Sequence, residues 1–448
     1  MKSVCLFLAA LWIMAGWMSP LVAHAAEAEV ASPAAQDPFG QEDPFTVIEG
    51  KPQVAAPDEA RLKSPSRGPQ ARAEVFIREF AASINDGSRI NPDNRIMELK
   101  RNIGTAETRL TMSDHIDRRE TVRWLFKGFA ASGSYLAANG AQRQKEARVD
   151  ELFADWKGDD LFASIGKRRV NWGHAQGFNP VNVIAPPRDP INPGYQTEGQ
   201  PMAWGSHRTA WGSMDVILTR NFDADWNSNQ NRWGLKWGGA GADTDYALYY
   251  FDGGNYADGR PYERMAGASF ATVSVPGITL YMEAANFARN YRNYYAADGV
   301  ARRKDDGYFQ GVAGLSLGLG GRSGFFAEYF HNGQGYSAGE RANYFRTADA
   351  RLGNGFDPVI TGDFVPLGMD RNYLLANFTK EFWEKYTFGF SSLLAGDGSS
   401  STRAEIAYAV SDYYELRAVY LYNEGDSGSE FGNSPYKGLF EIGIKASF

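Results

Sequence analysis

Apolar and polar side chains alternate strictly through residues 439–448, which read L-F-E-I-G-I-K-A-S-F. In an extended strand one face carries Phe440, Ile442, Ile444, Ala446 and Phe448, and the other carries Glu441, Gly443, Lys445 and Ser447. A period of two with unlike faces is typical of a strand that separates two different media. The pattern predicts a strand with one apolar side and one aqueous side.

The same alternation recurs in residues 121–136, 403–410 and 413–422. Charged residues at mid-strand are costly in lipid but natural in a water-filled lumen. We therefore expect the charged face of these strands to line a lumen. The expected lumen-facing residues are Arg123, Lys127, Arg403, Glu405, Glu415, Arg417 and Lys445.

Strand-length segments separated by Gly, Asn and Asp turns follow one another from residue 71 onward. The expected strands are 72–83, 95–103, 106–112, 121–136, 148–156, 161–170, 209–220, 231–237, 243–251, 265–275, 278–289, 308–317, 323–330, 372–379, 386–394, 403–410, 413–422 and 438–448. At about 20 residues per strand and turn, this region predicts a closed antiparallel transmembrane β-barrel of 16 or 18 strands. A propeller is disfavoured because the sequence shows no fixed repeat of about 40–50 residues.

The first 25 residues have the form of a secretory signal peptide. Lys2 precedes an apolar run, and Ala23-His24-Ala25 is a small-x-small cleavage site. The single cysteine, Cys5, lies within this segment, so we expect no disulfide or thiolate metal site in the mature chain. Residues 26–70 are rich in Ala, Pro and charge and predict a disordered leader, which is either a spacer or a docking segment for a periplasmic partner.

Composition narrows the class of protein further. Tyr, Phe and Trp are abundant and Gly is frequent, yet the mean hydropathy is only −0.42. This combination fits a barrel with a wet lumen and aromatic girdles. The formal charge of −7 argues against nucleic-acid binding.

An aromatic C-terminal strand together with a secretory signal resembles the bacterial outer-membrane β-barrels. In that family the last strand closes the barrel and is recognised by the barrel-assembly machinery. The resemblance assigns barrel closure to Phe440, Ile442, Ile444 and Phe448, and it implies contact with membrane lipid in the outer membrane of a Gram-negative bacterium.

A proline-rich stretch at 172–207 interrupts the strands and is expected to form a long loop. Basic residues on and before this stretch are Lys167, Arg168, Arg169, His174 and Arg188. One interpretation is an inward loop that narrows a pore and favours anions. The other is an extracellular loop or plug without a role in selectivity.

The run G-K-R-R-V-N-W-G at residues 166–173, followed by F-N-P and P-R-D-P, also resembles a motif of large, porin-like proteobacterial outer-membrane barrels. In those proteins the motif ends a barrel strand and begins an inward loop. The resemblance covers residues 166–190 and supports the barrel architecture without indicating a solute.

A second long connection, residues 331–371, is expected to be an extracellular loop. Asp349, Asp357 and Asp363 lie within it, but they lack the spacing of known calcium loops, so solvated loop acids are the simpler interpretation.

Catalytic motifs are missing from the sequence. It contains no H-E-x-x-H and no G-x-S-x-G, and Ser206 and His207 are adjacent and would point to opposite faces of a strand. We therefore expect no enzyme activity, cofactor or metal. Three functions remain, in order of preference: a porin-like channel for small hydrophilic solutes, a barrel sleeve for a partner such as an electron-conducting cytochrome, and a lipid-modifying barrel enzyme.

Overall fold

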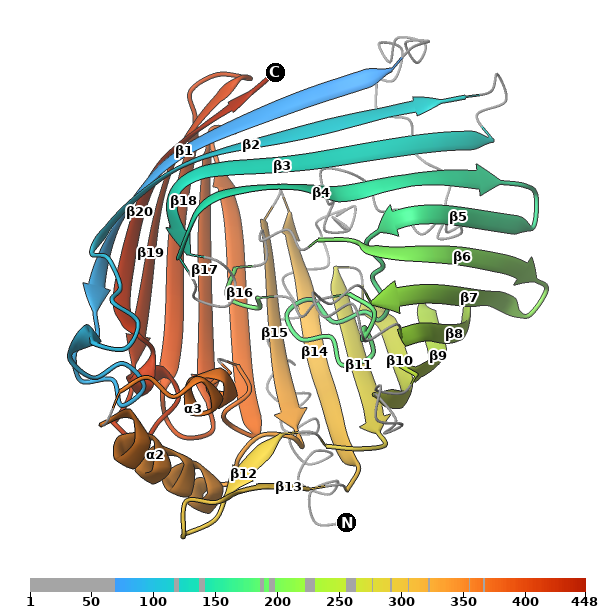
Figure 1. The fold of residues 1–448 in the computed structure, drawn as a ribbon. Helices are drawn as coiled ribbons and strands as arrows, with labels where there is room; N and C mark the ends of the chain where they lie inside the picture. Colours follow the sequence, from blue (N-terminus) through green and yellow to red (C-terminus); the bar gives the residue numbers. More distant parts are fainter. Residues whose placement is uncertain are drawn as a thin grey trace.

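The computed structural model is a closed antiparallel β-barrel of 18 strands (Figure 1). It describes residues 69–448 except 117–120, 137–141, 186–188, 193–197, 222–229, 255–262, 276, 291, 305, 321–322, 354 and 366. The expected signal peptide, and the expected leader up to residue 68, lie outside the described residues. The barrel and its strand number confirm the fold predicted from the sequence.

Each barrel strand pairs antiparallel with its neighbours along the chain, and the first also pairs with the last. The strands are β1 (Gln70–Ile84), β2 (Asn102–His115), β3 (Val122–Leu136), β4 (Gln142–Lys157), β5 (Leu161–Arg168), β6 (Gln200–Thr209), β7 (Gly212–Asn221), β8 (Gln230–Ala240), β9 (Thr244–Asp252), β10 (Arg264–Val275), β11 (Ile278–Phe287), β14 (Tyr308–Gly320), β15 (Ser323–Asn332), β16 (Asn372–Phe382), β17 (Tyr386–Ala395), β18 (Ser400–Ala409), β19 (Tyr414–Glu424) and β20 (Tyr436–Ser447). A separate two-stranded sheet pairs β12 (Asn293–Tyr295) with β13 (Ala301–Arg303). The helices are η3 (Pro92–Asn94), α2 (Ala338–Leu352), α3 (Pro358–Asp363) and η4 (Phe431–Asn433).

Two expectations about the strands are wrong: 95–103 and 106–112 are not two strands but are replaced by the single strand β2, and β6 was not expected. Residues 95–101 belong to the connection between β1 and β2, where Asn91 and Asn94 side chains accept local backbone N–H groups in place of a strand partner. In contrast, β6 begins within the range 172–207 that was expected to be loop and runs to Thr209, so the loop spans 169–199. Pro201 is tolerated because it stands near the start of the strand.

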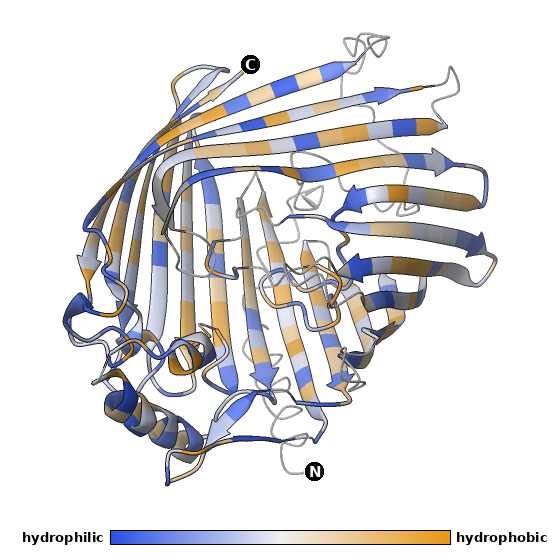
Figure 2. Ribbon diagram, in the orientation of Figure 1, coloured by the Kyte–Doolittle hydropathy of each residue, from blue (hydrophilic) through white to orange (hydrophobic). Residues whose placement is uncertain are grey.

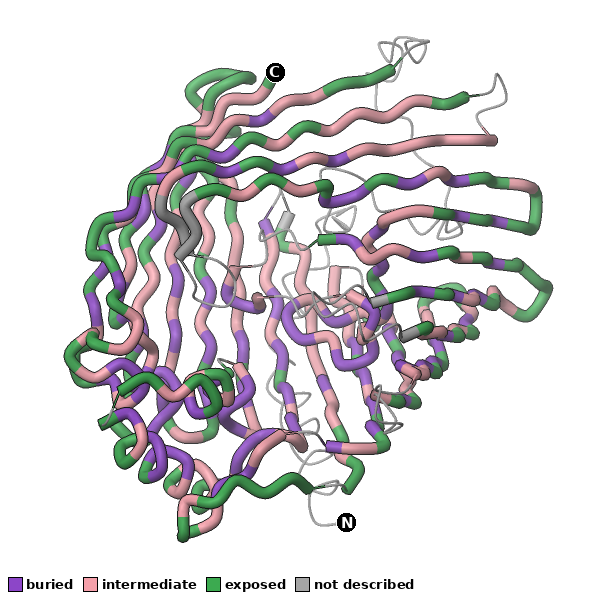
Figure 3. The backbone as a smooth tube through the Cα atoms, viewed as in Figure 1, coloured by how far each residue is buried: buried purple, intermediate pink, exposed green. Residues whose placement is uncertain are grey.

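Hydrophobic and hydrophilic residues alternate along many barrel strands (Figure 2), and so do buried and exposed residues (Figure 3). Ile77 of β1 and Ile442 of β20 are 58% and 55% exposed on the outside, whereas Arg78 and Glu441, one position along each strand, point inward. This arrangement is the transmembrane pattern of a barrel with an aqueous lumen. Among the described residues, no helix is long and apolar enough to cross a membrane.

The two ends of the barrel differ. The end at which β20 finishes carries short connections such as 158–160, 383–385 and 410–413, and we call it the short-turn end. The opposite end carries α2, α3, β12 and β13 and the connection 425–435, and we call it the long-loop end (Figure 1). Short turns face the periplasm and long loops face outward in barrels of this type.

A compact cap covers part of the long-loop end. Ser337 and Glu340 form a capping box that starts α2, and Tyr344, Phe345 and Leu352 of this helix are buried. These side chains pack with Ile90 from the β1–β2 connection and with others from the 288–307 and 358–369 segments. The expected loop at 331–371 is thus a folded connection that contains two helices.

Candidate functional site

The inner wall from β18 through β20 and on to β5 is strongly charged, and we call it the charged arc. Five of its carboxylates are each shared between two cations: Glu74 between Arg72 and Lys445, Glu107 between Arg78 and Arg109, Glu151 between Lys127 and Arg169, Asp155 between Arg123 and Arg168, and Glu405 between Arg403 and Arg417. Arg148, in contrast, lies between two acids, Glu146 and Asp150, and Arg78 also lies 3.8 Å from Glu441. Each of these five groups has one more cation than acid, and the acids beside Arg148 and Arg78 offset part of that excess. The arc is thus a dense network of ion pairs on the inner wall.

In most of these pairs the cation is also more exposed than its acid. The side chain of Arg109 is 25% exposed and that of Glu107 is 8% exposed; the values for Arg123 and Asp155 are 39% and 7%. The carboxylates lie against the wall and the guanidinium groups stand further into the lumen. The cations of these pairs are therefore more accessible from the lumen than their acids.

Aromatic rings hold several of these arginines in place. The Arg168 guanidinium lies 4.5 Å from the ring centroid of Phe153 and 4.9 Å from that of Trp204. The guanidinium of Arg148 lies 4.2 Å from the Phe129 ring. Stacking of this kind keeps a planar cation in one orientation at little electrostatic cost. The charged surface is therefore preorganised.

The other inner wall, from β6 to β17, carries two apolar patches that are covered by the loop 169–199, which folds into the barrel (Figures 1 and 3). One apolar cluster joins Trp172 and Val181 of the loop to Phe251 and Met265 of the wall. A second cluster joins the loop's Ala175, Phe178 and Ile191 to the inner side chains of β15, β16 and β17. The loop is the inward one of the two forms expected from the sequence, and it leaves the charged arc facing it across the lumen.

The structure does not gather the basic residues expected at a constriction. Arg168 and Arg169 lie on the charged arc, paired with Asp155 and Glu151. His174 lies on the loop side, with its Nε2 atom 3.4 Å from Asp245. The fifth residue, Arg188, lies outside the described residues.

Lys167 does not belong to the lumen, which corrects its expected role at a constriction. It pairs in register with Leu152, whose side chain is 51% exposed on the outer face, and it forms an ion pair with Glu198. Its neighbour Arg168 points inward because adjacent side chains of a strand face opposite ways. Three consecutive residues of a strand cannot all point into the lumen, because neighbouring side chains lie on opposite faces.

The other expected residues occupy the faces assigned to them by alternation. Arg123, Lys127, Arg403, Glu405, Glu415, Arg417 and Lys445 lie at inner-face register positions. Phe440, Ile442 and Ile444 lie on the outer face of β20, which pairs with β1, and the Phe448 N–H donates to the Ala73 carbonyl.

Several inner-wall residues were not singled out from the sequence. Arg78, Arg109 and Arg148 lie on the charged arc, and Glu283 and Glu328 are buried beneath the loop. The two glutamates stand alone among apolar side chains in L-Y-M-E-A-A and F-F-A-E-Y-F. A lone acid on the inner face of such a strand was the available signal, but it is also what a solvated wall residue looks like.

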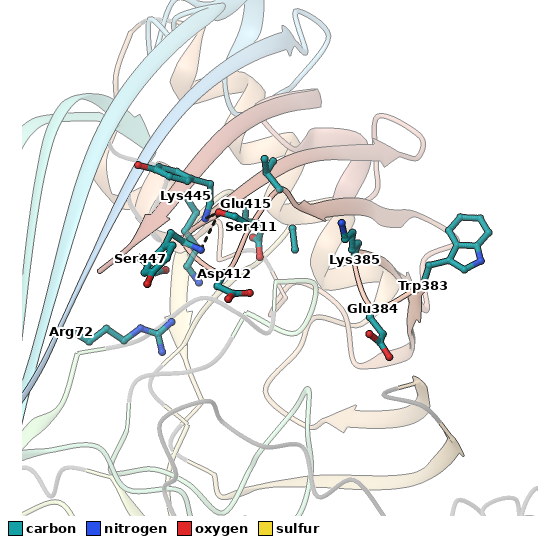
Figure 4. A pocket seen from close by; sticks show the side chains of 13 residues that line it. Arg72, Trp383, Glu384, Lys385, Ser411, Asp412, Glu415, Lys445 and Ser447 are labelled. Carbon is teal, nitrogen blue, oxygen red and sulfur yellow. Dashed lines mark hydrogen bonds between the residues drawn. The ribbon is translucent and has the colours of Figure 1, made fainter. Parts of the chain in front are cut away.

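A pocket of about 560 Å³ opens at the short-turn end (Figure 4). Its lining combines the cations of Arg72, Lys385 and Lys445 with the acids of Glu384, Asp412 and Glu415. Trp383, 84% exposed, stands beside it. Mixed charge and an interfacial Trp are features of a barrel rim, where the wall passes from lipid to water.

The remaining candidate residues have structural partners. Asp349 pairs with Arg89, Asp357 caps α3, and Asp363 accepts hydrogen bonds from Asn293 and Tyr295. No group of three or more His, Cys, Asp or Glu residues suited to a metal ion occurs in the described part of the chain.

Ser206 and His207 lie apart, as expected for neighbours on a strand. The buried Ser206 hydroxyl donates to Asp215, whereas the exposed His207 ring lies 3.2 Å from the Asp160 carbonyl. The Ser206 hydroxyl therefore has no histidine base in this pair.

The fold resembles solved structures of outer-membrane channels. OccAB1 of Acinetobacter baumannii is 12% identical, with a TM-score of 0.50 over 84% of this chain and 96% of that protein. OccK1 (OpdK) of Pseudomonas aeruginosa is 14% identical, with a TM-score of 0.49 over 85% and 98% of the two chains. No protein-family model matches the sequence, and no curated protein matches it significantly. The similarity to OccAB1 extends to the fold and defines the class as a large transmembrane β-barrel.

Proposed function

We propose that this protein is an outer-membrane channel of a Gram-negative bacterium that passes small hydrophilic solutes and prefers anions. The observation that carries the proposal is the arrangement of the charged arc, in which cations such as Arg109 stand further into the lumen than the acids they share. A wall of this kind raises the local concentration of anions and lowers that of cations. The short-turn end would face the periplasm.

A sleeve around a partner protein is the alternative from another class. Such a sleeve needs an unoccupied lumen along its whole length. Here Trp172 and Phe178 of the inward loop pack against the inner wall and occupy part of the lumen, so a channel for small solutes is the better-supported function. A lipid-modifying enzyme has no supporting constellation among the described residues.

The test is single-channel recording of the refolded protein in a planar bilayer under a salt gradient. We expect stepwise conductance and a reversal potential that favours the anion. Arg109→Glu should shift the reversal potential toward the cation, because it replaces a partly exposed cation beside Glu107. Arg302→Glu is the control, since Arg302 lies on β13 outside the barrel wall and is 67% exposed. A folded barrel that never conducts would contradict the proposal.

A further inference from the structure

The inward loop is attached to the wall through two buried carboxylates. Glu283 of β11 accepts hydrogen bonds from the backbone N–H groups of His174 and Ala175, the latter at 2.7 Å. Glu328 of β15 accepts the N–H groups of three consecutive loop residues, Gln176, Gly177 and Phe178, at 2.6 to 3.1 Å. The two glutamates are 3% and 1% exposed. Backbone N–H groups aimed at a carboxylate form charge-assisted hydrogen bonds, which are about twice as strong as neutral ones.

Most of the hydrogen bonds that offset the cost of burying these carboxylates come from the loop. Among the described residues no ion pair with Lys, Arg or His reaches either one; besides the amides of residues 174–178, the Tyr281 hydroxyl donates to Glu328 Oε1 at 2.8 Å and the Val181 backbone N–H donates to Glu283. A buried charge without a cation is stable only when several hydrogen-bond donors surround it. The loop amides between residues 174 and 178 supply most of those donors.

Two glycines make this close approach possible. A Cβ atom on Gly173 would lie 2.2 Å from Glu283 Oε1, and Gly173 has a φ of +90°, which favours glycine. A Cβ atom on Gly177 would lie 2.2 Å from Leu375 and 3.0 Å from Glu328 Oε2. Each glycine thus sits over one carboxylate, which gives a physical reason for the sequence W-G-H-A-Q-G-F at this point.

Aromatic contacts flank the hydrogen bonds on both sides. The Phe178 ring stacks on Phe330 with centroids 4.4 Å apart, and the Trp172 ring lies 5.4 Å from that of Tyr249. Trp172 is 1% exposed. Burial of both rings adds a favourable term to the attachment and excludes water from the amide–carboxylate bonds.

We propose that Glu283 and Glu328 are positioning residues that fix residues 172–178 as a permanent wall of the lumen. The loop is then a built-in constriction whose place is set by these two carboxylates, and it does not act as a movable plug. The claim that the loop forms a constriction for conduction rests on the proposed channel function. The claim that the two carboxylates hold the loop in place rests on the hydrogen bonds alone.

The first test is hydrogen–deuterium exchange of the refolded barrel, which does not depend on conduction. Amides 174–178 should be protected in the unmodified protein. In Glu283→Gln and Glu328→Gln they should exchange at least about tenfold faster, because the Gln amide has one acceptor oxygen where the carboxyl group has two. Glu441→Gln is the matched control: this carboxylate is also buried, but it lies on the charged arc, 3.8 Å from Arg78. Unchanged protection in the double variant Glu283→Gln/Glu328→Gln would overturn the inference.

A second variant keeps both carboxylates, and exchange of its strand amides shows whether the barrel as a whole is still folded. Gly177→Ala should release amides 176–178 because its Cβ meets Leu375 and Glu328. Exchange of strand amides, such as those of β19, should stay as slow as in the unmodified protein in every variant that is compared. If Gly177→Ala left these amides protected, the close approach would not be required and the inference would be wrong.

Conductance measurements on the same variants then distinguish a failure of this inference from a failure of the proposed channel function. Release of the loop should give larger and more variable conductance steps in Glu328→Gln, whereas Glu441→Gln should change selectivity without adding fluctuation. If the unmodified barrel never conducts while its loop amides lose protection in the variants, the channel function fails and the positioning role stands. Steady, unaltered steps in Glu328→Gln would overturn the role of Glu328 in setting the constriction.

Discussion

Lys445 Nζ of the last strand lies 3.1 Å from Glu74 Oε1 of the first strand, across the seam where the barrel closes. The pair lies on the inner face, and its carboxylate is 7% exposed. Glu415, opposite Lys445 on β19, lies on the same face. Lys445 therefore separates two acids that would otherwise face each other across three neighbouring strands.

Reversal of this charge should destabilise the seam. Lys445→Glu places a third carboxylate between Glu74 and Glu415 and should lower the free energy of unfolding by about 1–3 kcal/mol. Lys445→Met removes the pair without adding repulsion, so its cost should be at most about 1 kcal/mol. Urea unfolding of both variants, followed by Trp fluorescence, measures the difference. Equal effects of the two variants would show that the seam is insensitive to its charges.

Arg168 and its neighbour Lys167 should differ sharply on substitution. Arg168→Ala removes one of the two cations on Asp155 and a guanidinium stacked on Phe153 and Trp204, so it should cost about 2 kcal/mol of stability and weaken anion preference. Lys167→Ala removes a partly exposed pair with Glu198 and should change stability by no more than about 0.5 kcal/mol. Unfolding and reversal-potential measurements on the two variants check this contrast. A larger selectivity change in Lys167→Ala would contradict its outer-face position.

Stability of the long-loop end should fall as the pH rises from about 4.5 to 7. Burial raises the pKa of Glu430 to about 7, against hydrogen bonds from Tyr373 and Leu367. The folded state then binds more protons than the unfolded state in this window, so stability decreases with pH. Glu430→Gln should remove most of this decrease in stability with rising pH. Exchange of amides 426–435, corrected for intrinsic rates at pH 5 to 8, is the measurement, and a slope that persists in the variant would count against Glu430.

Glu340 should act in the opposite direction at lower pH. Burial disfavours its charged form, but hydrogen bonds from Lys304 and Ser337 outweigh this effect and lower the pKa to about 2. Its contribution to the stability of the cap is present above about pH 4.5 and is lost as the pH falls toward 2. In the unmodified protein, protease cleavage within residues 333–371 should become faster as the pH falls between these values. In Glu340→Gln this dependence of cleavage on pH should be lost.

The N-terminus of α2 offers a separate test of the cap. Ser337→Ala removes the side chain that accepts the Glu340 N–H and should cost about 1 kcal/mol locally. Cleavage within residues 333–371 should then become faster, while the barrel strands stay intact. Ser411→Ala, in the turn between β18 and β19 at the opposite end, is the control. Equal cleavage of the two variants would show that the capping box does not limit opening of the cap.

The sequence alone determined the face on which strand residues lie. Alternation in β18, β19 and β20 placed Arg403, Arg417 and Lys445 inside and Ile442 outside, because the period of two depends only on local backbone geometry. The capping signal S-A-G-E at Ser337 was also present, although α2 was expected to be loop. Its helix is polar overall and is stabilised by packing of Tyr344 and Phe345 against distant segments.

Only the tertiary structure decided what fills the lumen. Glu328 binds loop amides about 150 positions earlier in the chain, and no local pattern reports such a partner. The face on which Lys167 lies was also not predictable from a local pattern, because it depends on where β5 ends and the loop begins. Strand faces follow from neighbouring residues, whereas the inward loop follows from the requirement that its backbone N–H groups and two buried carboxylates satisfy one another.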